Sequence, residues 1–128
     1  MEIRSVYPTE WIKPKGHYTP AIIHNGIVYV SGQLPLDPKG EAQLGTIEEQ
    51  TTVCLKNIET ILKESGSSLD HILKVNVFIA DIGNWAKFNE TYAKIMGEHR
   101  PARIVVPCGT LNRGCAIEID CIAAVQSK

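Results

Sequence analysis

The sequence lacks any apolar run near the roughly 18 residues that a membrane-spanning helix needs. Its first residues, Met1-Glu2-Ile3-Arg4, lack the apolar centre of a signal peptide. An excess of one charge is also missing, because 13 basic and 14 acidic residues give a net charge of -1 at pH 7. A nucleic-acid-binding domain usually gathers basic residues on one face, whereas the two signs alternate along this chain. We therefore expect a cytoplasmic protein that has neither a membrane nor a nucleic acid as its partner.

Motifs that bind phosphate groups or metals are absent as well. The 10 glycines form neither a phosphate-cradling loop nor a dinucleotide-binding fingerprint, and no nucleophile elbow or kinase signature is present. No two histidines stand at the i, i+4 spacing that would place both on one face of a helix. The histidines are His17, His24, His71 and His99. Their scatter predicts that the chain holds no metal.

The four cysteines form no recognisable framework. Cys108, Cys115 and Cys121 are spaced C-x6-C-x5-C, which lacks the closely paired ligands of zinc sites. No export signal suggests an oxidising compartment, so we expect reduced, structural thiols rather than disulfides. Cys108 falls in a predicted loop and is the best candidate for a reactive thiol.

What is present favours one globular domain over residues 1–128. A chain of 128 residues with 44% hydrophobic and 21% charged residues can bury a core of its own. Two β-rich runs flank Asn25-Gly26, the pair typical of a type I′ hairpin turn. Residues 32–45, which contain Pro35, Pro38 and Gly40, should form a loop.

A helix should follow this loop. Thr46 and Glu49 fit a capping box, and the helix should end near Gly66. Apolar residues recur at helical spacing, which predicts that one face packs on a sheet. These residues are Ile47, Cys54, Leu55, Ile58, Ile61 and Leu62, and polar residues that include Gln50 occupy the remainder.

The second half predicts a strand over residues 72–80, a helix over 83–98 that Pro101 ends, and strands over 103–107 and 115–125. Lys74 and Asn76 should point away from the core. The order of strand, hairpin, helix, strand, helix, strand and strand lacks regular βαβ alternation. It indicates an α+β fold, a mixed β-sheet with two helices packed on one face. Partner subunits are the natural candidates to bury the other face.

Two charged residues stand out within apolar strands. Arg103 begins a run of Ile104, Val105 and Val106, and Glu118 lies between apolar neighbours. If the last two strands pair through a turn near residues 110–111, Arg103 and Glu118 should face each other and could share a cleft. Spacing alone favours a plainer alternative, a cross-strand ion pair or two solvated charges.

At these residues the chain resembles the Rid, or YjgF-type, family of reactive-intermediate deaminases, over residues 18–124 in a single register. The segment Val30-Ser-Gly-Gln-Leu-Pro35 is similar to the S-G-Q-x-P segment of that family. Further similar blocks are Gln50 with Asn57-Ile58, the stretch from Val75 to Asp81 that runs into Phe88-Asn-Glu-Thr-Tyr92, Pro101-Ala-Arg103, and Ile117-Glu-Ile119 with Ile122-Ala123.

The resemblance implies a fold like that of the bacillus-type chorismate mutase, assembled as a homotrimer with clefts between subunits. It implies hydrolytic deamination of 2-aminoacrylate-type enamines and imines to 2-keto acids and ammonia, with no metal or organic cofactor. The small-molecule partner would thus be an imine, an enamine or a 2-keto acid.

Site residues are carried over position by position from the resemblance. Arg103 matches the arginine that binds the substrate carboxylate, and Glu118 matches the glutamate that handles the attacking water. Tyr18 and Ser31 match residues that line the cleft, and Asn89 matches an asparagine nearby. Without the resemblance these three are ordinary polar residues at a strand edge, in a turn and on a helix surface.

The chain departs from the family at two places that bear on the pocket. Val105 stands where deaminating relatives often carry a cysteine, a thiol that water attack does not require. Residues 107–114, which include Arg113, also differ, so substrate choice is less determined than the chemistry. Three alternatives stay open: a non-catalytic regulatory trimer that binds small carboxylates, a catabolic deaminase such as one acting on 2-aminomuconate, and a ribonuclease or translation inhibitor. The neutral charge balance disfavours the third.

Overall fold

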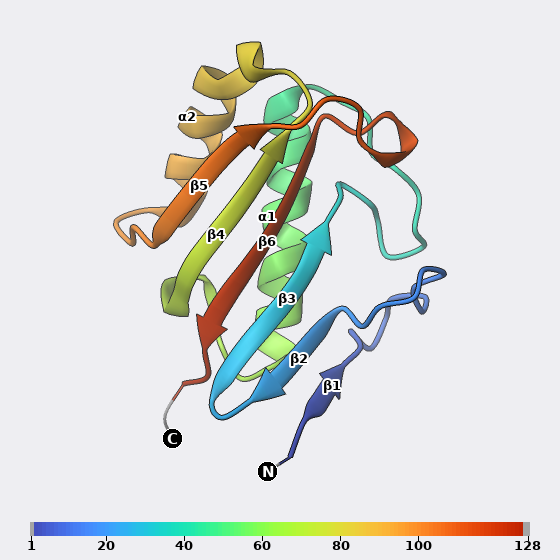
Figure 1. The fold of residues 1–128 in the computed structure, drawn as a ribbon, viewed down its shortest axis with the longest axis vertical. Coiled ribbons are helices and arrows are strands. Elements are labelled where there is room, and N and C mark those ends of the chain that lie inside the picture. The colour runs from blue at the N-terminus through green and yellow to red at the C-terminus, as the bar shows by residue number, and fades with distance from the viewer. Residues whose placement is uncertain (1, 127–128) are drawn as a thin grey trace.

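The computed structural model describes residues 2–126, which form a six-stranded sheet and two α-helices (Figure 1). The strands are β1 (Arg4–Val6), β2 (Ala21–His24), β3 (Ile27–Gln33), β4 (Ile72–Ile79), β5 (Ala102–Pro107) and β6 (Ile117–Ala124). The α-helices are α1 (Ile47–Glu64) and α2 (Trp85–Met96), and short 3₁₀ turns cover Leu69–His71, Ile82–Asn84 and Asn112–Gly114. Within residues 2–126 no helix is long and apolar enough to cross a membrane.

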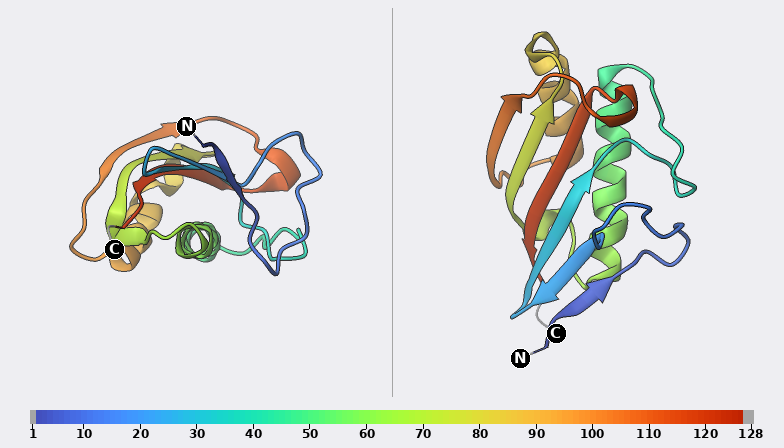
Figure 2. Two further views of the ribbon diagram at one scale, coloured as in Figure 1. Left: turned by 90° about the horizontal axis from the view of Figure 1, so that it is seen from below. Right: turned by 45° about the vertical axis from the view of Figure 1, so that its right-hand side comes forward.

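The sheet is mixed, as the sequence predicts. Its strand order is β1-β2-β3-β6-β4-β5, and every neighbouring pair is antiparallel except β4 and β5. Parallel neighbours need a crossover connection, and α2 supplies it between β4 and β5. Figure 2 shows both helices on the same side of the sheet, so the predicted α+β fold with two helices on one face is confirmed.

The core lies between the helices and the sheet. Buried side chains alternate along β4 (Val75, Val77, Ile79) and β6 (Ile117, Ile119, Cys121), as the strand period requires. The predicted apolar face of α1 is buried against them. Because the other face of the sheet carries no helix, its alternate residues are covered only in part.

The local predictions around the hairpin and α1 are confirmed. Asn25 and Gly26 have φ angles of 53° and 75°, which is the left-handed conformation that a type I′ turn requires. Thr46 and Glu49 form the predicted capping box at the start of α1. The predicted loop begins later than residue 32, because β3 continues through Gln33.

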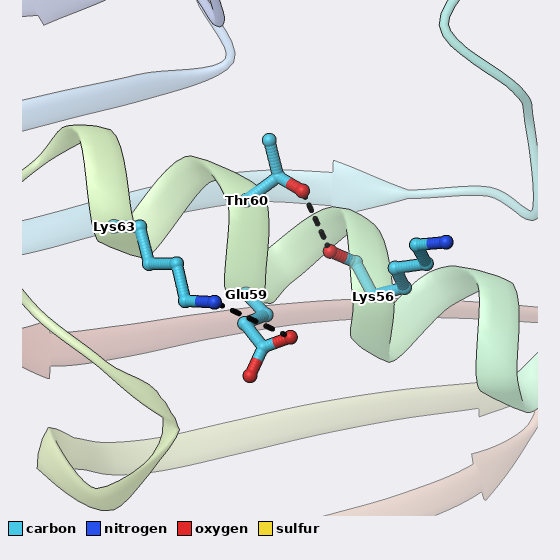
Figure 3. Close-up of polar contacts among 4 residues, drawn as sticks. All are labelled: Lys56, Glu59, Thr60 and Lys63. Atoms are coloured by element: carbon cyan, nitrogen blue, oxygen red, sulfur yellow. Dashed lines mark hydrogen bonds and ion pairs between the residues drawn. The ribbon is translucent and has the colours of Figure 1, made fainter.

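The solvent face of α1 carries short-range polar contacts (Figure 3). Lys63 lies 4.0 Å from Glu59, and the Thr60 hydroxyl donates a 3.1 Å hydrogen bond to the carbonyl of Lys56. An exposed i, i+4 pair of this kind contributes under about 1 kcal/mol. These contacts therefore add little stability, and this face of α1 is exposed to solvent.

Gln50 was expected on that polar face, and this expectation is wrong. Gln50 is only 5% exposed, because its side chain bridges two segments. Its Oε1 accepts from the Ala116 amide at 2.8 Å and its Nε2 donates to the Gly45 carbonyl at 2.9 Å. Asn57 acts similarly, since its Nδ2 donates to the Leu36 carbonyl at 2.8 Å. These two amides hold the 34–46 loop and the entry to β6 against α1.

Two element ends differ from the sequence prediction. The helix expected over residues 83–98 is α2 preceded by a 3₁₀ turn, and it stops before Gly97, whose φ is 68°. This positive φ, which glycine adopts readily, ends the helix before Pro101 is reached. The last strand begins at Ile117 rather than residue 115, because Asn112–Gly114 forms a turn.

The expected pairing of the last two strands is wrong. β5 pairs with β4, and β6 lies between β3 and β4. The α2 crossover places β5 beside β4 at the sheet edge, and the loop after β5 passes over β4 to reach β6 (Figure 1). Arg103 is consequently opposite Val75, and Glu118 is opposite Phe78.

Candidate functional site

Glu118 lies on the face of the sheet that the helices leave uncovered. It alternates along β6 with the buried Ile117 and Ile119, and its side chain is partly buried. There it lines a cavity of about 780 Å³, which is within the range of ligand-binding cavities. Glu118 is thus a carboxyl group presented to a concave surface.

Tyr18 and Ser31 line the same cavity as Glu118. The Ser31 hydroxyl donates a 2.5 Å hydrogen bond to the Thr19 carbonyl, and its amide donates to the Pro20 carbonyl at 2.9 Å. Both bonds hold the loop before β2 against β3. Tyr18 is 51% exposed at the cavity rim, so its ring is free to meet a ligand or a second protein surface.

The environment of Glu118 favours its protonated form. Burial raises the pKa of the Glu118 carboxyl above its usual 4.5, and the nearby Asp120 carboxylate raises this pKa further. A carboxyl group with a raised pKa exchanges protons more readily near neutral pH. Asp120 accepts a 2.8 Å hydrogen bond from the Asn76 side chain, which holds it on the same face.

Arg103 points to the opposite face of the sheet. Residues paired in register share a face, and its partner Val75 belongs to the core under the helices. The Arg103 guanidinium lies 4.9 Å from the centroid of the Tyr92 ring and within 6 Å of two more rings, at 5.7 Å from Phe88 and 5.9 Å from Trp85. The aromatic rings of α2 therefore fix its plane.

Asn89 and Val105 belong to the Arg103 side. The Asn89 Oδ1 accepts a 2.9 Å hydrogen bond from Arg103, so this asparagine orients the guanidinium. Val105 is opposite Val77 and packs against the core. Neither residue lines the cavity of Glu118. The predicted site residues thus fall into two groups, with Tyr18, Ser31 and Glu118 in one, and Asn89, Arg103 and Val105 in the other.

A shared cleft within one chain is excluded. Arg103 on β5 is in register with Val75 on β4 and Cys121 on β6. Glu118 therefore lies two strands away from Arg103 and three residues away from Cys121 along β6. Strand spacings of about 4.8 Å and a rise of about 3.3 Å per residue put the two backbones roughly 14 Å apart. Because the side chains also point to opposite faces, the expected direct juxtaposition in one chain is wrong.

Comparison with known proteins decides the family. The family model for endoribonuclease L-PSP matches residues 9–125. The chain belongs to this family. A curated relative, the mitochondrial protein MMF1 of Saccharomyces cerevisiae, is 44% identical over 110 residues, which are 86% of this chain and 76% of that protein.

Solved structures of the L-PSP family share the whole fold. A Yersinia pestis protein of the Rid family, YyfA, superposes with a TM-score of 0.91 at 36% identity and covers 97% of this chain and 100% of its own. Escherichia coli TdcF with bound serine gives a TM-score of 0.87 at 30% identity, covering 97% and 99%. The resemblance to the Rid, or YjgF-type, family is confirmed.

The aromatic surroundings of Arg103 in this L-PSP-family chain were not predicted from the sequence. Trp85, Phe88 and Tyr92 belong to the predicted helix over residues 83–98, yet no contact with Arg103 was predicted for them. Trp85 and Tyr92 stand one turn before and one turn after Asn89, and this spacing was a usable signal. Arg113, in the 107–114 segment that was expected to bear on the pocket, lines the Glu118 cavity. Within residues 2–126 no three His, Cys, Asp or Glu side chains gather as a metal site would need.

Gly32 gives the Glu118 carboxylate its space. A Cβ built on Gly32 would lie 2.6 Å from the Glu118 Oε2, far inside van der Waals contact. We expect Gly32→Ala to displace the carboxylate and to lower kcat/KM by about 10²-fold, because a displacement near 1 Å can cost that much. Gly83→Ala, outside the cavity, is the matched control. The catalytic rate and the melting temperature should be measured together. An active Gly32→Ala variant would show that the position of Glu118 is not critical.

Proposed function

We propose that this protein hydrolyses reactive enamines and imines of 2-keto acids, releasing the keto acid and ammonia. It would do so as a homotrimer whose active site joins Arg103 of one protomer to Glu118 of its neighbour. The observation that carries this proposal is the placement of the two residues on opposite faces of one sheet. Within one chain Arg103 and Glu118 cannot contact the same ligand, and a head-to-tail ring of protomers would bring Arg103 of one chain to Glu118 of the next.

The surface around Glu118 supports an interface between protomers. Ile104 is 48% exposed and Tyr29 is 46% exposed on the face that no helix covers. Phe78, on the same face, lies directly beside Glu118 on the neighbouring strand β4. Apolar side chains concentrated on one face of a sheet favour burial against another protein surface. A trimer would bury this face and close the Glu118 cavity.

Arg103 is suited to hold the substrate carboxylate. A guanidinium has five N–H donors in a planar fork, and Asn89 accepts from only one nitrogen. The fork that remains can bind a carboxylate through two parallel hydrogen bonds, which a lysine cannot reproduce. Because the rings of α2 already fix the plane, little entropy is lost when the carboxylate binds.

Glu118 is suited to move the protons. Its carboxylate would take a proton from water as the oxygen bonds to the imine carbon and the C=N electron pair moves to nitrogen. The same carboxyl group would return that proton to the nitrogen, and it would then take the proton of the new hydroxyl group and pass it to the amine, so that ammonia leaves as the C=O bond forms. No covalent intermediate is needed, so placing water and substrate together supplies most of the rate enhancement.

A mixed oligomer tests this arrangement directly. Arg103→Ala and Glu118→Gln should each be inactive, yet trimers refolded from an equal mixture should recover about one quarter of wild-type activity. This fraction follows because half of the chains retain Arg103, half retain Glu118, and a cyclic interface combines them at random. Imine loss, followed with a coupled amino-acid dehydratase, measures the recovery. A mixture as inactive as its components would overturn the intersubunit site.

Two alternatives use the same residues. A trimer that only binds small carboxylates would show saturable 2-keto acid binding without faster imine loss, and the TdcF structure with bound serine supports small-molecule binding in the family. A dedicated catabolic deaminase would act on one imine far better than on others.

We place the protein in the cytoplasm. Since the relative MMF1 is named as mitochondrial, fractionation of cells is the experiment that checks this location.

A further inference from the structure

The Glu118 cavity is lined by several basic residues that the proposed mechanism does not use. Three separate segments contribute four basic side chains, although the whole chain has a net charge of -1. These residues are Lys13, Lys15, Lys39 and Arg113. The acidic residues of the lining are Asp37, Glu41 and Glu118. Within the described part of the chain none of the four cations takes part in an ion pair, since the pairs found there involve Lys63 and Lys94.

The Asp37 carboxylate is engaged within its own turn. Its carboxylate accepts hydrogen bonds of 2.9 Å from the amides of Lys39 and Glu41 and closes its own turn. With four basic and three acidic residues, the lining carries an excess of one positive charge when all of them are ionised. In a recessed surface such an excess attracts anions more strongly than on a flat one.

Arg113 is held in place more firmly than the lysines. Its guanidinium donates to the Gly40 carbonyl, and its backbone has a φ of 60°, a left-handed conformation that is uncommon for a residue with a side chain. A backbone hydrogen bond from Ile12 to the Pro38 carbonyl, at 3.0 Å, joins a third segment to this wall. The remaining donors of Arg113 are available to a ligand in the cavity.

The geometry points to a substrate with two anionic groups: an imine of a dicarboxylic 2-keto acid whose distal carboxylate binds Arg113. This inference rests on the proposed deaminase function. Arg103 of the neighbouring protomer would hold the carboxylate beside the imine, Glu118 would act on the imine carbon, and Arg113 would hold the far end. The cavity of about 780 Å³ has room for this longer chain.

The test compares two imines of equal chain length, one ending in a carboxylate and the other in a methyl group. They are the imines of 2-oxoglutarate and 2-oxopentanoate, generated in place by amino-acid oxidases. We expect a kcat/KM about 10-fold higher for the dicarboxylic imine, the ratio that a single charge-assisted hydrogen bond can supply. Arg113→Asn should remove this preference and leave the monocarboxylic rate within about 2-fold.

Asparagine is chosen because it tolerates the left-handed backbone, and Arg113→Lys should retain part of the preference. Arg4→Gln, which removes an arginine from β1, is the matched control. An equal kcat/KM for both imines in the wild type, or an equal loss on both in Arg113→Asn, would overturn the inference. If neither imine is hydrolysed, the proposed function fails. Calorimetry with 2-oxoglutarate and 2-oxopentanoate then tests the distal carboxylate site by itself. Tighter binding of 2-oxoglutarate that Arg113→Asn abolishes would support the distal site, and equal binding of the two acids would overturn it.

Discussion

Arg103→Ala is expected to lower kcat/KM for imine hydrolysis by about 10³-fold while the protein still assembles as a trimer. Losing one partner of a desolvated charge pair typically costs about 2–5 kcal/mol, and each 1.4 kcal/mol is about tenfold. The loss should appear mainly in KM, because the carboxylate anchor acts in the ground state and in the transition state.

The packing of Arg103 makes controls for folding necessary. Its guanidinium contacts the rings of Trp85, Phe88 and Tyr92, so alanine also removes a contact surface. Arg103→Met keeps most of the stem and should be as inactive as alanine. Arg103→Lys keeps the charge without the fork and should be intermediate. Light scattering and the melting temperature report assembly; a folded Arg103→Met trimer with near-wild-type activity would remove the carboxylate anchor from the mechanism.

Asn89 should act through Arg103 rather than on the substrate. Its Oδ1 holds one guanidinium nitrogen at 2.9 Å, so Asn89→Ala should raise KM by about 10-fold, the effect of one charge-assisted hydrogen bond, with little change in kcat. Asn89→Asp keeps an acceptor and should restore part of the affinity. A fall in kcat at constant KM in Asn89→Ala would instead indicate a direct role in the chemical step.

The local structure was predictable because it depends on short-range chemistry. The Asn25-Gly26 turn requires left-handed backbone that these two residues provide at low cost, and the Thr46 capping box satisfies amides within one helical turn. Gln50 was misplaced for the opposite reason. Its burial depends on the Ala116 amide, 66 residues away, and helical periodicity carries no information about such a partner.

The types of residue in the candidate site could be read from the sequence, but the relative positions of Arg103 and Glu118 could not. Arg103 and Glu118 stood out as charges within apolar strands. In the structure Glu118 lines a cavity and Arg103 lies against the aromatic rings of α2. Their spacing in sequence suggested a hairpin, whereas the α2 crossover inserts β4 between their strands. Strand order is a non-local property, because it depends on which edges remain free when the helices pack. The contact between protomers that would bring Arg103 and Glu118 together in the proposed trimer cannot be read from the spacing of residues in one sequence.

Glu118→Gln should reduce kcat by about 10²–10⁴-fold, the usual contribution of a general acid–base group. In the wild type, kcat/KM should rise with pH through the pKa of Glu118, because only the carboxylate can accept a proton from water. This rise should lie above pH 4.5, since burial and Asp120 both raise this pKa. The Glu118→Gln variant should lack that limb of the profile.

The same substitution should stabilise the protein at neutral pH. An acid whose pKa is higher in the folded state binds protons more tightly there, so its stabilising contribution is present below the unfolded pKa. That contribution is lost as the pH rises through the folded pKa. The neutral amide of Glu118→Gln avoids the cost of burying a charge, and its melting temperature should exceed that of the wild type at neutral pH. The difference should vanish at acid pH, where Glu118 is protonated. A melting temperature below the wild type at neutral pH would mean that the ionised carboxylate is paired in the assembled protein, as close contact with the guanidinium of a neighbouring protomer would require.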